Sequence, residues 1–520
     1  MTRYIVTAAP PNPNGDLHLG HLSGPFLGAD VQARYLQGQG HPVLHVSYID
    51  EHSCYVPRRA RELGADPYET ARALGTRIEQ TLALGHMLPG FVGRPHRDAH
   101  HDLLVTRHFS QLWDRGCLQV AEDDVYWCST CEHYLYEAEM RGSCHHCGAA
   151  SDGFYCEECG RPQTSGHLRE AYCTTCGSTP TLRRHRRIFF PLDKYRHRLT
   201  DYFRDRPLRP RLRQYLDLML SEPLPATPIS RIGEYGIGVP LEEWAGHYLD
   251  TWFSGYFGYL AAAELAARTS GHETPDWTDD EAQVLEFLGF DCSFSHAVLW
   301  TALAMALGTV PTPAQLNTNE FYRLEGAKFS TSRGHAIWGG EFLTTVPADS
   351  LRFHLCLTGP ETKQTNFSRC AFVDTTRDVL VGGLQGLLAR FDDATLAPTP
   401  GATDAELLER VDSWRSEVGA SLEPAHFSPA AAAESIRCHV TDARLAALVD
   451  SAGGTARLTA LRQIAGLAHP LMPGWTNDVL TAIDPAYPQL AAFSTSPGRN
   501  PYRLTVGATP IEIRSLALDE

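Results

Sequence analysis

Residues 4–21, YIVTAAPPNPNGDLHLGH, decide the fold, because an apolar run passes there through a proline- and glycine-rich turn into a helix. Tyr4 to Ala9 has the apolar, β-rich character of a first buried strand. Apolar residues recur at helical spacing from Leu17 to Leu36, and Val43 to Ile49 is a second β-rich run that ends at Asp50. This βαβ unit predicts an α/β fold with a doubly wound parallel sheet, whose ligands bind beyond the carboxyl ends of the strands.

The composition favours a globular enzyme of several domains. With 520 residues, the chain exceeds what one hydrophobic core organises. No apolar run approaches the roughly 20 residues of a membrane span, and Met1 to Ala9 is too short for a secretory signal, so we expect a cytoplasmic protein without membrane contact. The net charge of −16 offers no global attraction to nucleic acid, although a local basic face could still bind it.

Eight of the 14 cysteines form four Cys-x-x-Cys pairs within one polar segment. Two thiolates from each pair suit two tetrahedral, four-thiolate zinc sites, and such closed sites are structural because they leave no position open for water. The segment is too polar to form a core unaided, which indicates an insertion held by metal. The predicted zinc ligands are Cys128, Cys131, Cys144, Cys147, Cys156, Cys159, Cys173 and Cys176.

Shifts in composition divide the chain into five segments. α/β character on both sides of the cysteine-rich insertion indicates one catalytic core in two halves, followed by a loop region and an Ala- and Leu-rich helical domain. The predicted segments are 1–121 (first half of the core), 122–188 (zinc-knuckle insertion), 189–320 (second half), 321–370 (loop and connecting region) and 371–520 (helical domain).

Two short motifs carry the chemistry. His18-Leu19-Gly20-His21 lies at a helix start, where backbone amides and the helix dipole favour anions; alone, the two histidines could equally be solvated or capping residues. Downstream, Gly326 to Gly334 surrounds Lys328 with small residues, which suits a loop that brings an ammonium group to a departing pyrophosphate. Alone, this second motif could be a surface turn.

Together, the two motifs resemble the HIGH and KMSKS signatures of class I aminoacyl-tRNA synthetases. Further blocks resemble the methionyl branch of that family: Asp50-Glu51-His52, Ile229-Ser230-Arg231, and Gly289-Phe290-Asp291 with His296. The resemblance covers most of residues 1–370 and weakens beyond them. It implies a Rossmann-type class I core with a zinc-knuckle insertion and a C-terminal α-helical domain that resembles a degenerate anticodon-binding domain. It also implies a ligase that activates an amino acid as its adenylate.

The resemblance also implies roles for individual residues. The residues implied to act on the phosphates are His18, His21, Lys328 and Arg231. Those implied to bind ATP are Asn14, Gly20, Gly289, Asp291, Ser330 and Ser332. Those implied to bind the amino acid are Pro10, Asn12, Asp50, Trp252, Gly255, Tyr256, Tyr259 and His296, with Asp50 taking the α-ammonium. The implied cofactors are ATP, Mg²⁺ and two structural Zn²⁺ ions, with the two middle cysteine pairs on one zinc and the two outer pairs on the other.

The pocket departs from the family pattern in its apolar wall. Asn12 follows Pro11 where the family has a tyrosine, and Gly255 and Tyr256 stand where it has Ala and Pro. We expect Tyr256 to occupy volume that a thioether would fill, which favours a smaller or more polar amino acid than methionine.

The helical domain departs further. Gly386 stands four residues before Arg390, where the family reads the anticodon with an Asn, and no counterpart of the stacking Pro-Trp lies between Leu445 and Leu467. Loss of a base-edge contact and a stacking platform predicts that methionine tRNA is not recognised. Two arginine groups, 183–187 and 204–213, could meet RNA or form a solvated face.

These departures favour tRNA-independent transfer of the aminoacyl group to a small nucleophile. The resemblance extends to the synthetase-like halves of hydrazine synthetases, natural-product enzymes that act with a zinc cupin on N6-hydroxylysine, so a hydroxylamine acceptor and a separate cupin protein are the partners expected on this reading. The alternative is a methionyl-tRNA synthetase that charges tRNA(Met). An inactive scaffold is disfavoured, because His18, His21, Lys328, Asp50 and Asp291 are all present.

Overall fold

The computed structural model describes residues 2–163, 166–270, 282–329, 334–391 and 400–483. Its centre is a five-stranded sheet in which every neighbouring pair of strands is parallel, in the order β14-β13-β1-β2-β3. These strands are β1 (Arg3–Ala8), β2 (Val43–Tyr48), β3 (Phe91–Gly93), β13 (Ala282–Gly289) and β14 (Gln315–Asn319). The chain leaves β1 toward one edge of the sheet and later returns to its other side, which places a topological switch point between β1 and β13.

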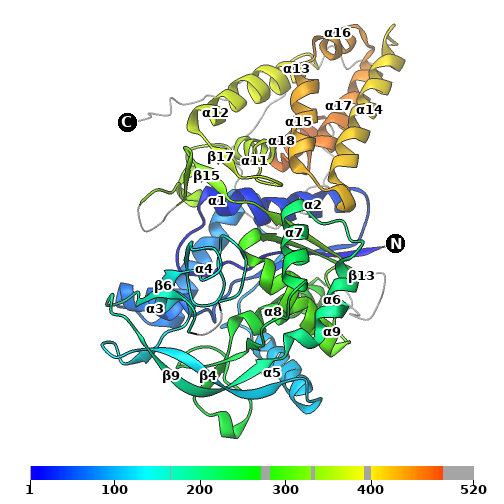
Figure 1. The fold of residues 1–520 in the computed structure, drawn as a ribbon. Helices are drawn as coiled ribbons and strands as arrows, with labels where there is room; N and C mark the ends of the chain where they lie inside the picture. The colour runs from blue at the N-terminus through cyan, green and yellow to red at the C-terminus, as the bar shows by residue number, and fades with distance from the viewer. Residues whose placement is uncertain (1, 164–165, 271–281, 330–333, 392–399, 484–520) are drawn as a thin grey trace.

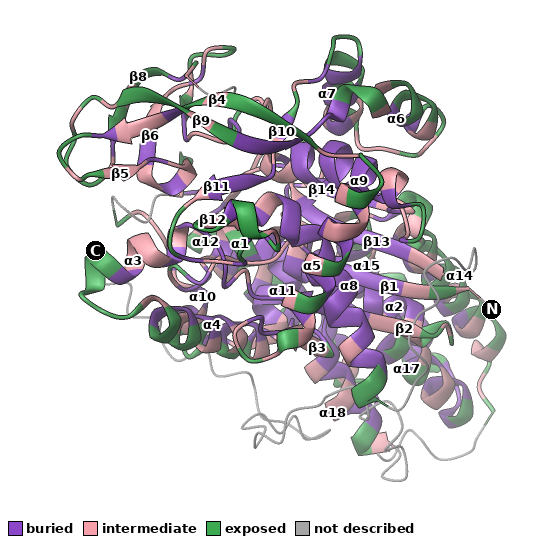
Figure 2. Cartoon of the chain, turned by 90° about the horizontal axis from the view of Figure 1, so that it is seen from below, coloured by how far each residue is buried: buried purple, intermediate pink, exposed green. Residues whose placement is uncertain are grey.

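Helices cover both faces of this sheet, as the doubly wound prediction requires. Side chains alternate along β1, so that Ile5 packs with Ala262 and Ala266 of α8 (Thr251–Thr269), while Val6 packs in the cluster that contains Leu27 and Val31 of α2 (Leu27–Gly38). Figure 2 shows buried residues concentrated in the sheet and in these helices. The α/β fold predicted from the sequence is thereby confirmed.

Further helices and two small sheets surround this central sheet. These helices are α1 (Leu19–His21), α3 (Tyr55–Leu63), α4 (Pro67–Leu84), α5 (Ala99–Asp114), α6 (Arg196–Phe203), α7 (Pro210–Leu220), α9 (Thr301–Leu307), α10 (Gly339–Leu343) and α11 (Ala348–Leu357). The small sheets contain β11 (Ser230–Ile232) with β12 (His247–Leu249), and β15 (Tyr322–Leu324) with β16 (Ala327–Lys328) and β17 (Thr365–Phe367).

Within the described residues, the stretch Phe290–Leu307 is the one helical segment long and apolar enough to cross a membrane. Of this segment, 78% is buried inside the protein, as in a core helix.

The cysteine-rich insertion is built on a long antiparallel ribbon. Its strands are β4 (Gln119–Cys128), β9 (Thr181–Phe190), β5 (His133–Tyr134) and β10 (Thr227–Pro228), followed by a second sheet of β6 (Met140–Ser143), β7 (Ala150–Ser151) and β8 (Arg169–Cys173). The ribbon lies at the end of the molecule opposite to the C-terminal helices (Figure 1).

The C-terminal region is helical, as predicted. Its helices are α12 (Arg369–Asp374), α13 (Gly386–Leu388), α14 (Asp404–Leu422), α15 (Pro429–Val440), α16 (Ala443–Ser451), α17 (Gly454–Ala468) and α18 (Pro473–Ile483). The region shares one hydrophobic cluster with α2, rather than forming a separate core. Arg352, which is fully buried, joins the two parts: it pairs with Asp30 of α2 at 2.7 Å and donates to the carbonyl of Leu471 at 3.0 Å. A buried charge needs such a partner, so this contact fixes the helices on the sheet.

Candidate active site

The two histidines of the first motif form a stacked pair just beyond β1. The rings of His18 and His21 lie 3.7 Å apart, and the backbone N–H of His18 donates to Nδ1 of His21 at 3.2 Å. Burial lowers the pKa of His18 to about 2 and that of His21 to about 4, so both are neutral imidazoles at pH 7. His18 Nδ1 is buried without a hydrogen-bond partner in the described chain, so it is free for a ligand.

The second motif reaches the first one through Phe329. Its ring stacks on His18 at 4.6 Å, and a Cβ on Gly20 would lie only 3.1 Å from Phe329 and 2.9 Å from the His18 ring, so this position needs glycine. The next residue toward the N-terminus, Lys328, pairs with Glu157 of the insertion at 3.1 Å. The structure therefore brings both motifs together, as the resemblance implies. Ser330 and Ser332 lie outside the described residues.

Asp291 follows the end of β13, across the switch point from the histidines. Its carboxylate folds back over Gly289, where a Cβ would collide with Oδ1 of Asp291. Burial, together with the nearby Glu157, raises the pKa of Asp291 to about 6. Gly289 thus makes room for the carboxylate of its own turn, and Asp291 is held at the strand end where a parallel sheet binds its ligand.

Asp50 follows the end of β2 and is joined to the loop after β1 by its backbone N–H, which donates to the carbonyl of Pro11 at 3.0 Å. Burial raises the pKa of Asp50 to about 7, despite the neighbouring guanidinium of Arg231. Arg231 is buried and donates to the carbonyl of His52 at 3.2 Å. The structure therefore places Arg231 near Asp50, and the role at the phosphates that the resemblance implies for it stays a prediction.

The predicted pocket residues of α8 form an aromatic group with His296. Because the carbonyl of Cys292 can only accept, Nδ1 of His296 donates to it at 3.1 Å, and Nε2 accepts from the hydroxyl of Tyr259 at 3.1 Å. Burial lowers the pKa of His296 to about 3, which keeps this ring neutral. The indole N–H of Trp252 donates to Glu137 at 3.1 Å. The polar atoms of these three rings are thus already bonded to protein.

The space above Gly255 is filled by Trp300. A Cβ at Gly255 would lie 2.8 Å from the Trp300 ring, whose N–H donates to the carbonyl of Trp252 at 2.6 Å. Tyr256 instead sends its hydroxyl to the carbonyl of Pro311. Tyr256 is thus a buried member of the hydrophobic core, and its expected effect on the volume of the pocket stays a prediction.

The remaining predicted residues line the loop after β1. Pro10 and Asn12 are half-buried, and Oδ1 of Asn12 is buried without a hydrogen-bond partner in the described structure. Asn14 is exposed, and its backbone N–H donates to the carbonyl of Asn12 at 2.9 Å. The loop is therefore open to a ligand at Asn14 and has an unused acceptor at Asn12.

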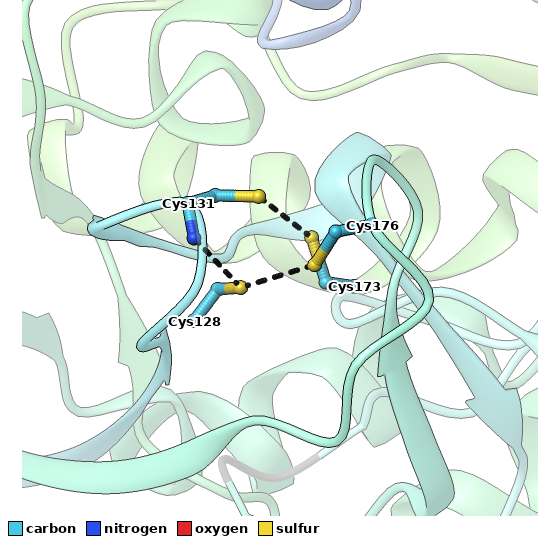
Figure 3. Close-up of side chains that lie close together, drawn as sticks. All are labelled: Cys128, Cys131, Cys173 and Cys176. Atoms are coloured by element: carbon cyan, nitrogen blue, oxygen red, sulfur yellow. Dashed lines mark hydrogen bonds between the residues drawn. The ribbon is translucent and has the colours of Figure 1, made fainter.

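The eight knuckle cysteines form two groups in which all four sulfurs lie within 4.8 Å of one another. The outer cluster contains Cys128, Cys131, Cys173 and Cys176 (Figure 3), and the middle cluster contains Cys144, Cys147, Cys156 and Cys159. Four recorded Sγ–Sγ distances across the pairs, from 3.5 to 4.0 Å, bracket the roughly 3.8 Å that a tetrahedral site with Zn–S bonds of about 2.3 Å requires. The residues fit zinc in the nested grouping that the resemblance implies.

The knuckle turns themselves are encoded locally. The residue after the second cysteine of each pair has a positive φ angle, and three of these four residues are glycine: Gly148 (φ 76), Gly160 (φ 72) and Gly177 (φ 74), with Glu132 (φ 54) as the fourth. Glycine adopts this left-handed conformation at no steric cost.

The two arginine groups are only partly engaged: some of their side chains have partners, while that of Arg184 is 73% exposed. On the ribbon, Arg187 pairs with Asp123 at 2.6 Å, and Arg183 stacks on Trp127. In the second group, Arg211 pairs with Glu320, and Arg209 donates to backbone carbonyls between the core and the C-terminal helices. Arg187 and Arg209 thus have structural contacts, and the RNA contact that the sequence left open stays a prediction.

In the helical region, Arg390 is also engaged. It forms an ion pair with Asp450 of α16, and both side chains are partly exposed. Gly386, one turn earlier, presents no side chain to a partner.

The sequence pattern did not indicate several residues that lie near the site. Glu137, Phe154 and Tyr155 of the insertion contact Trp252. Behind Asp50, the carboxylate of Asp102 lies 3.0 Å from His52 and 2.9 Å from His101. The adjacency of Phe154-Tyr155 to Cys156 is a local signal that could have indicated the first group, since a zinc knuckle fixes its neighbours in space.

Comparison with known proteins gives a consistent result. The family model described as "tRNA synthetases class I (M)" matches residues 4–391. The methionine–tRNA ligase of Methanobrevibacter smithii is 29% identical over 438 residues, which cover 82% of this chain and 66% of that protein. That of Pyrococcus abyssi is 31% identical over 459 residues, covering 83% of this chain and 63% of the relative. The chain thus spans slightly less than two thirds of the length of these curated relatives.

Solved structures show the same fold at low identity. Two structures of Mycobacterium tuberculosis methionyl-tRNA synthetase, both with methionyl-adenylate, are 19% identical and superpose with TM-scores of 0.71 and 0.73. They cover 93% and 98% of this chain, and 94% and 99% of their own chains.

Proposed function

Because this chain belongs to the class I tRNA synthetase family in its methionyl branch, we propose that it uses ATP to activate the carboxylate of an amino acid as its adenylate. The observation that carries the proposal is the meeting of three groups at the carboxyl ends of neighbouring strands. The His18–His21 pair follows β1, Asp50 follows β2 and Asp291 follows β13. One ligand spanning the switch point would contact all three.

In this proposal, each group takes one part of the substrates. His18 and His21 are neutral ring donors for the ATP phosphates, Asp291 and Gly289 take the ribose, and Asp50 takes the α-ammonium. Lys328 leaves Glu157 to neutralise pyrophosphate as it departs. Mg²⁺ bound to ATP would supply part of that charge neutralisation. Asn14 and Gly20 complete the nucleotide site, with Ser330 and Ser332 assigned to it by resemblance alone.

The amino acid in this proposal has an apolar side chain. Trp252, Tyr259 and His296 offer ring faces to the pocket, since their polar atoms already bond to Glu137, to each other and to Cys292. A polar side chain would find no free partner on these rings and would lose its hydrogen bonds to water. Methionine, the substrate in the names of the relatives, fits such a pocket, and it replaces the smaller or more polar amino acid expected from Tyr256.

The first candidate acceptor is tRNA(Met), because the curated relatives are methionine–tRNA ligases over more than four fifths of this chain. This choice reverses the order of the two alternatives drawn from the sequence. The five predicted segments and two structural zinc ions are part of the proposal. A cytoplasmic location is also part of it, since thiolate sites of this kind require a reducing compartment.

A second candidate is transfer to a small nucleophile such as a hydroxylamine. It is favoured by the helical region alone: Gly386 has no side chain for a base edge, and Arg390 is paired with Asp450. No contact in the described structure bears on N6-hydroxylysine or on a cupin partner, so those remain predictions from resemblance.

Pyrophosphate exchange tests the adenylation step. Purified protein should exchange labelled pyrophosphate into ATP when methionine is added, and His21→Ala and Lys328→Ala should each slow exchange by about a hundredfold or more, the cost of removing one transition-state donor. His335→Ala, in the same region of the loop but bonded to the carbonyl of Leu324, is the matched control. Absence of exchange with all twenty common amino acids and N6-hydroxylysine would refute the proposal.

Acyl transfer then separates the two acceptors. Wild-type protein is incubated with total tRNA or with hydroxylamine, and labelled methionine is followed into each product. Methionyl-tRNA is the expected product for the first candidate. Acyl-hydroxamate formed enzymatically, without any charged tRNA, would establish the second.

A further inference from the structure

The pocket tryptophan Trp252 is held from outside the sheet. Its indole N–H donates to Glu137 at 3.1 Å, Phe154 stacks on it at 5.2 Å with an interplanar angle of 11°, and Tyr155 meets it edge-on at 4.8 Å. All three residues belong to the cysteine-rich insertion and lie between Cys131 and Cys156 in the chain. Trp252 itself is the second residue of α8, fixed by a bond from its backbone N–H to Asp250 at 3.0 Å.

Glu137 is placed for this contact by a strained turn. It begins the short helical turn Glu137–Glu139 with a φ of 33°, a left-handed conformation that is costly for a residue with a side chain. Its second carboxyl oxygen accepts from the thiol of Cys54 at 3.3 Å. One carboxyl group therefore joins the insertion to α8 and to the segment after β2.

Phe154 and Tyr155 also reach the opposite side of the site. The Tyr155 hydroxyl lies 3.9 Å from the sulfur of Cys292, and the Phe154 ring lies 6.3 Å from that of Phe294. Cys292 and Phe294 follow β13 and lie between Asp291 and His296 in the chain. The two rings thus bridge the two walls between which an amino acid would bind.

The middle cysteine cluster fixes these rings. Tyr155 immediately precedes Cys156, and the carbonyl of Phe154 accepts from the backbone of Gln163 at 2.7 Å. Gln163 in turn donates from its side chain to the sulfur of Cys144 at 3.2 Å. The loop that bears both rings is therefore bonded on two sides to groups of one cluster, Cys144, Cys147, Cys156 and Cys159.

We propose that the insertion forms the outer wall of the amino-acid pocket, with Glu137, Phe154 and Tyr155 as positioning residues for Trp252. By holding these rings, the middle cluster contributes to the affinity for the amino acid, and loss of Glu137 or Phe154 alone leaves the affinity for ATP unchanged. This inference rests on the proposed adenylation function. It assigns the insertion a part in substrate binding, in addition to the structural role of its cysteine clusters.

The test compares Glu137→Leu with Glu137→Gln in protein loaded with zinc. Leucine removes the acceptor and leaves the indole N–H unpaired, whereas glutamine retains an acceptor oxygen. Glu137→Leu and Phe154→Leu should each raise the KM for methionine in pyrophosphate exchange by about tenfold, the cost of one unmade buried hydrogen bond or lost ring contact, with the KM for ATP within about twofold. Calorimetric titration of methionine without ATP should show the same loss of affinity, and Glu137→Gln should restore it.

The control is Tyr172→Leu, an exposed aromatic residue on β8 of the same insertion, which should leave both KM values unchanged. Zinc content and thermal unfolding identify any variant that fails to fold. If Glu137→Leu does not fold, Phe154→Leu and Glu137→Gln test the proposal in its place. An unchanged methionine KM in folded Phe154→Leu would overturn the proposal that the insertion forms the outer wall of the pocket. An equal rise in the KM values for methionine and ATP would overturn it as well. A wild-type protein that exchanges no pyrophosphate instead overturns the proposed function, so the two failures are distinct.

Discussion

The middle and outer cysteine clusters have the same ligands, yet their surroundings differ. The chain around the middle cluster sends Phe154 and Tyr155 to Trp252, and Glu157 to Lys328. The outer cluster joins the ribbon strand β4 to β8 and has only an indirect link to the site. The backbone N–H of Thr174 donates to the carbonyl of Glu139, in the turn that bears Glu137. Two clusters with the same set of cysteine side chains therefore have different neighbours, and the residues next to the cysteines decide what each cluster holds in place.

The largest expected difference comes from removing one thiolate in each cluster. Cys156→Ser and Cys176→Ser should each lower zinc content from about two ions per chain toward one. Cys156→Ser should raise the methionine KM by about a hundredfold, the cost typical of a 1 Å misplacement of a positioning group, and Cys176→Ser should raise it much less. Metal analysis and pyrophosphate exchange measure both effects. An equal rise in the methionine KM for both variants would contradict the difference proposed between the two clusters.

Between pH 6 and pH 8 the KM for methionine should depend on pH, because Asp50 lies at the end of the site where the amino acid would bind. Burial raises the pKa of Asp50 to about 7, so the fraction that is ionised and able to bind an ammonium group rises about tenfold from pH 6 to pH 8. The methionine KM should fall by about that factor over this range. Asp50→Asn should abolish the dependence. A methionine KM that stays flat in the wild type would contradict this role of Asp50.

The knuckle glycines give a smaller, matched contrast. Gly160 and Gly177 have nearly equal positive φ angles, but a Cβ at Gly160 would lie 2.8 Å from the Tyr215 ring, whereas Gly177 faces open space. Gly177→Ala should cost about 1 kcal/mol of stability from the backbone alone, and Gly160→Ala about 1–3 kcal/mol more from the clash. Chelator-induced zinc release and thermal unfolding report the difference. Similar losses of stability in the two variants would show that the Tyr215 ring moves aside without cost.

The smallest effect should come from the charge that meets Lys328. Glu157→Gln removes an ion pair in which both side chains are about half exposed, so the rate of exchange should change by no more than about fivefold. Glu132→Gln, at the corresponding edge of the outer cluster, should have no effect. A change well beyond fivefold for Glu157→Gln would mean that this carboxylate has a larger part in catalysis than the ion pair explains.

Much of the site could be predicted from the sequence, because its parts are local. The turn after β1 with His18 and His21, Asp50 at the end of β2 and the cysteine pairs are each encoded within a few residues. The surroundings of Gly255 and Tyr256 could not be predicted in this way. They depend on Trp300, which packs over Gly255, and on Pro311, which accepts from the Tyr256 hydroxyl, and both lie about fifty residues away in the chain.

From the sequence alone, the parallel sheet, the order of its motifs and the cysteines that form two groups of four could be predicted, because strand periodicity, glycine turns and Cys-x-x-Cys spacing are short-range properties. The packing of the folded chain was needed to show that Trp300 fills the space over Gly255, that Arg352 joins the helical region to α2, and that Glu137 bonds to Trp252 across 115 residues of chain. Such contacts depend on how separate layers pack, since a ring or carboxyl takes whatever space and partner its neighbours leave.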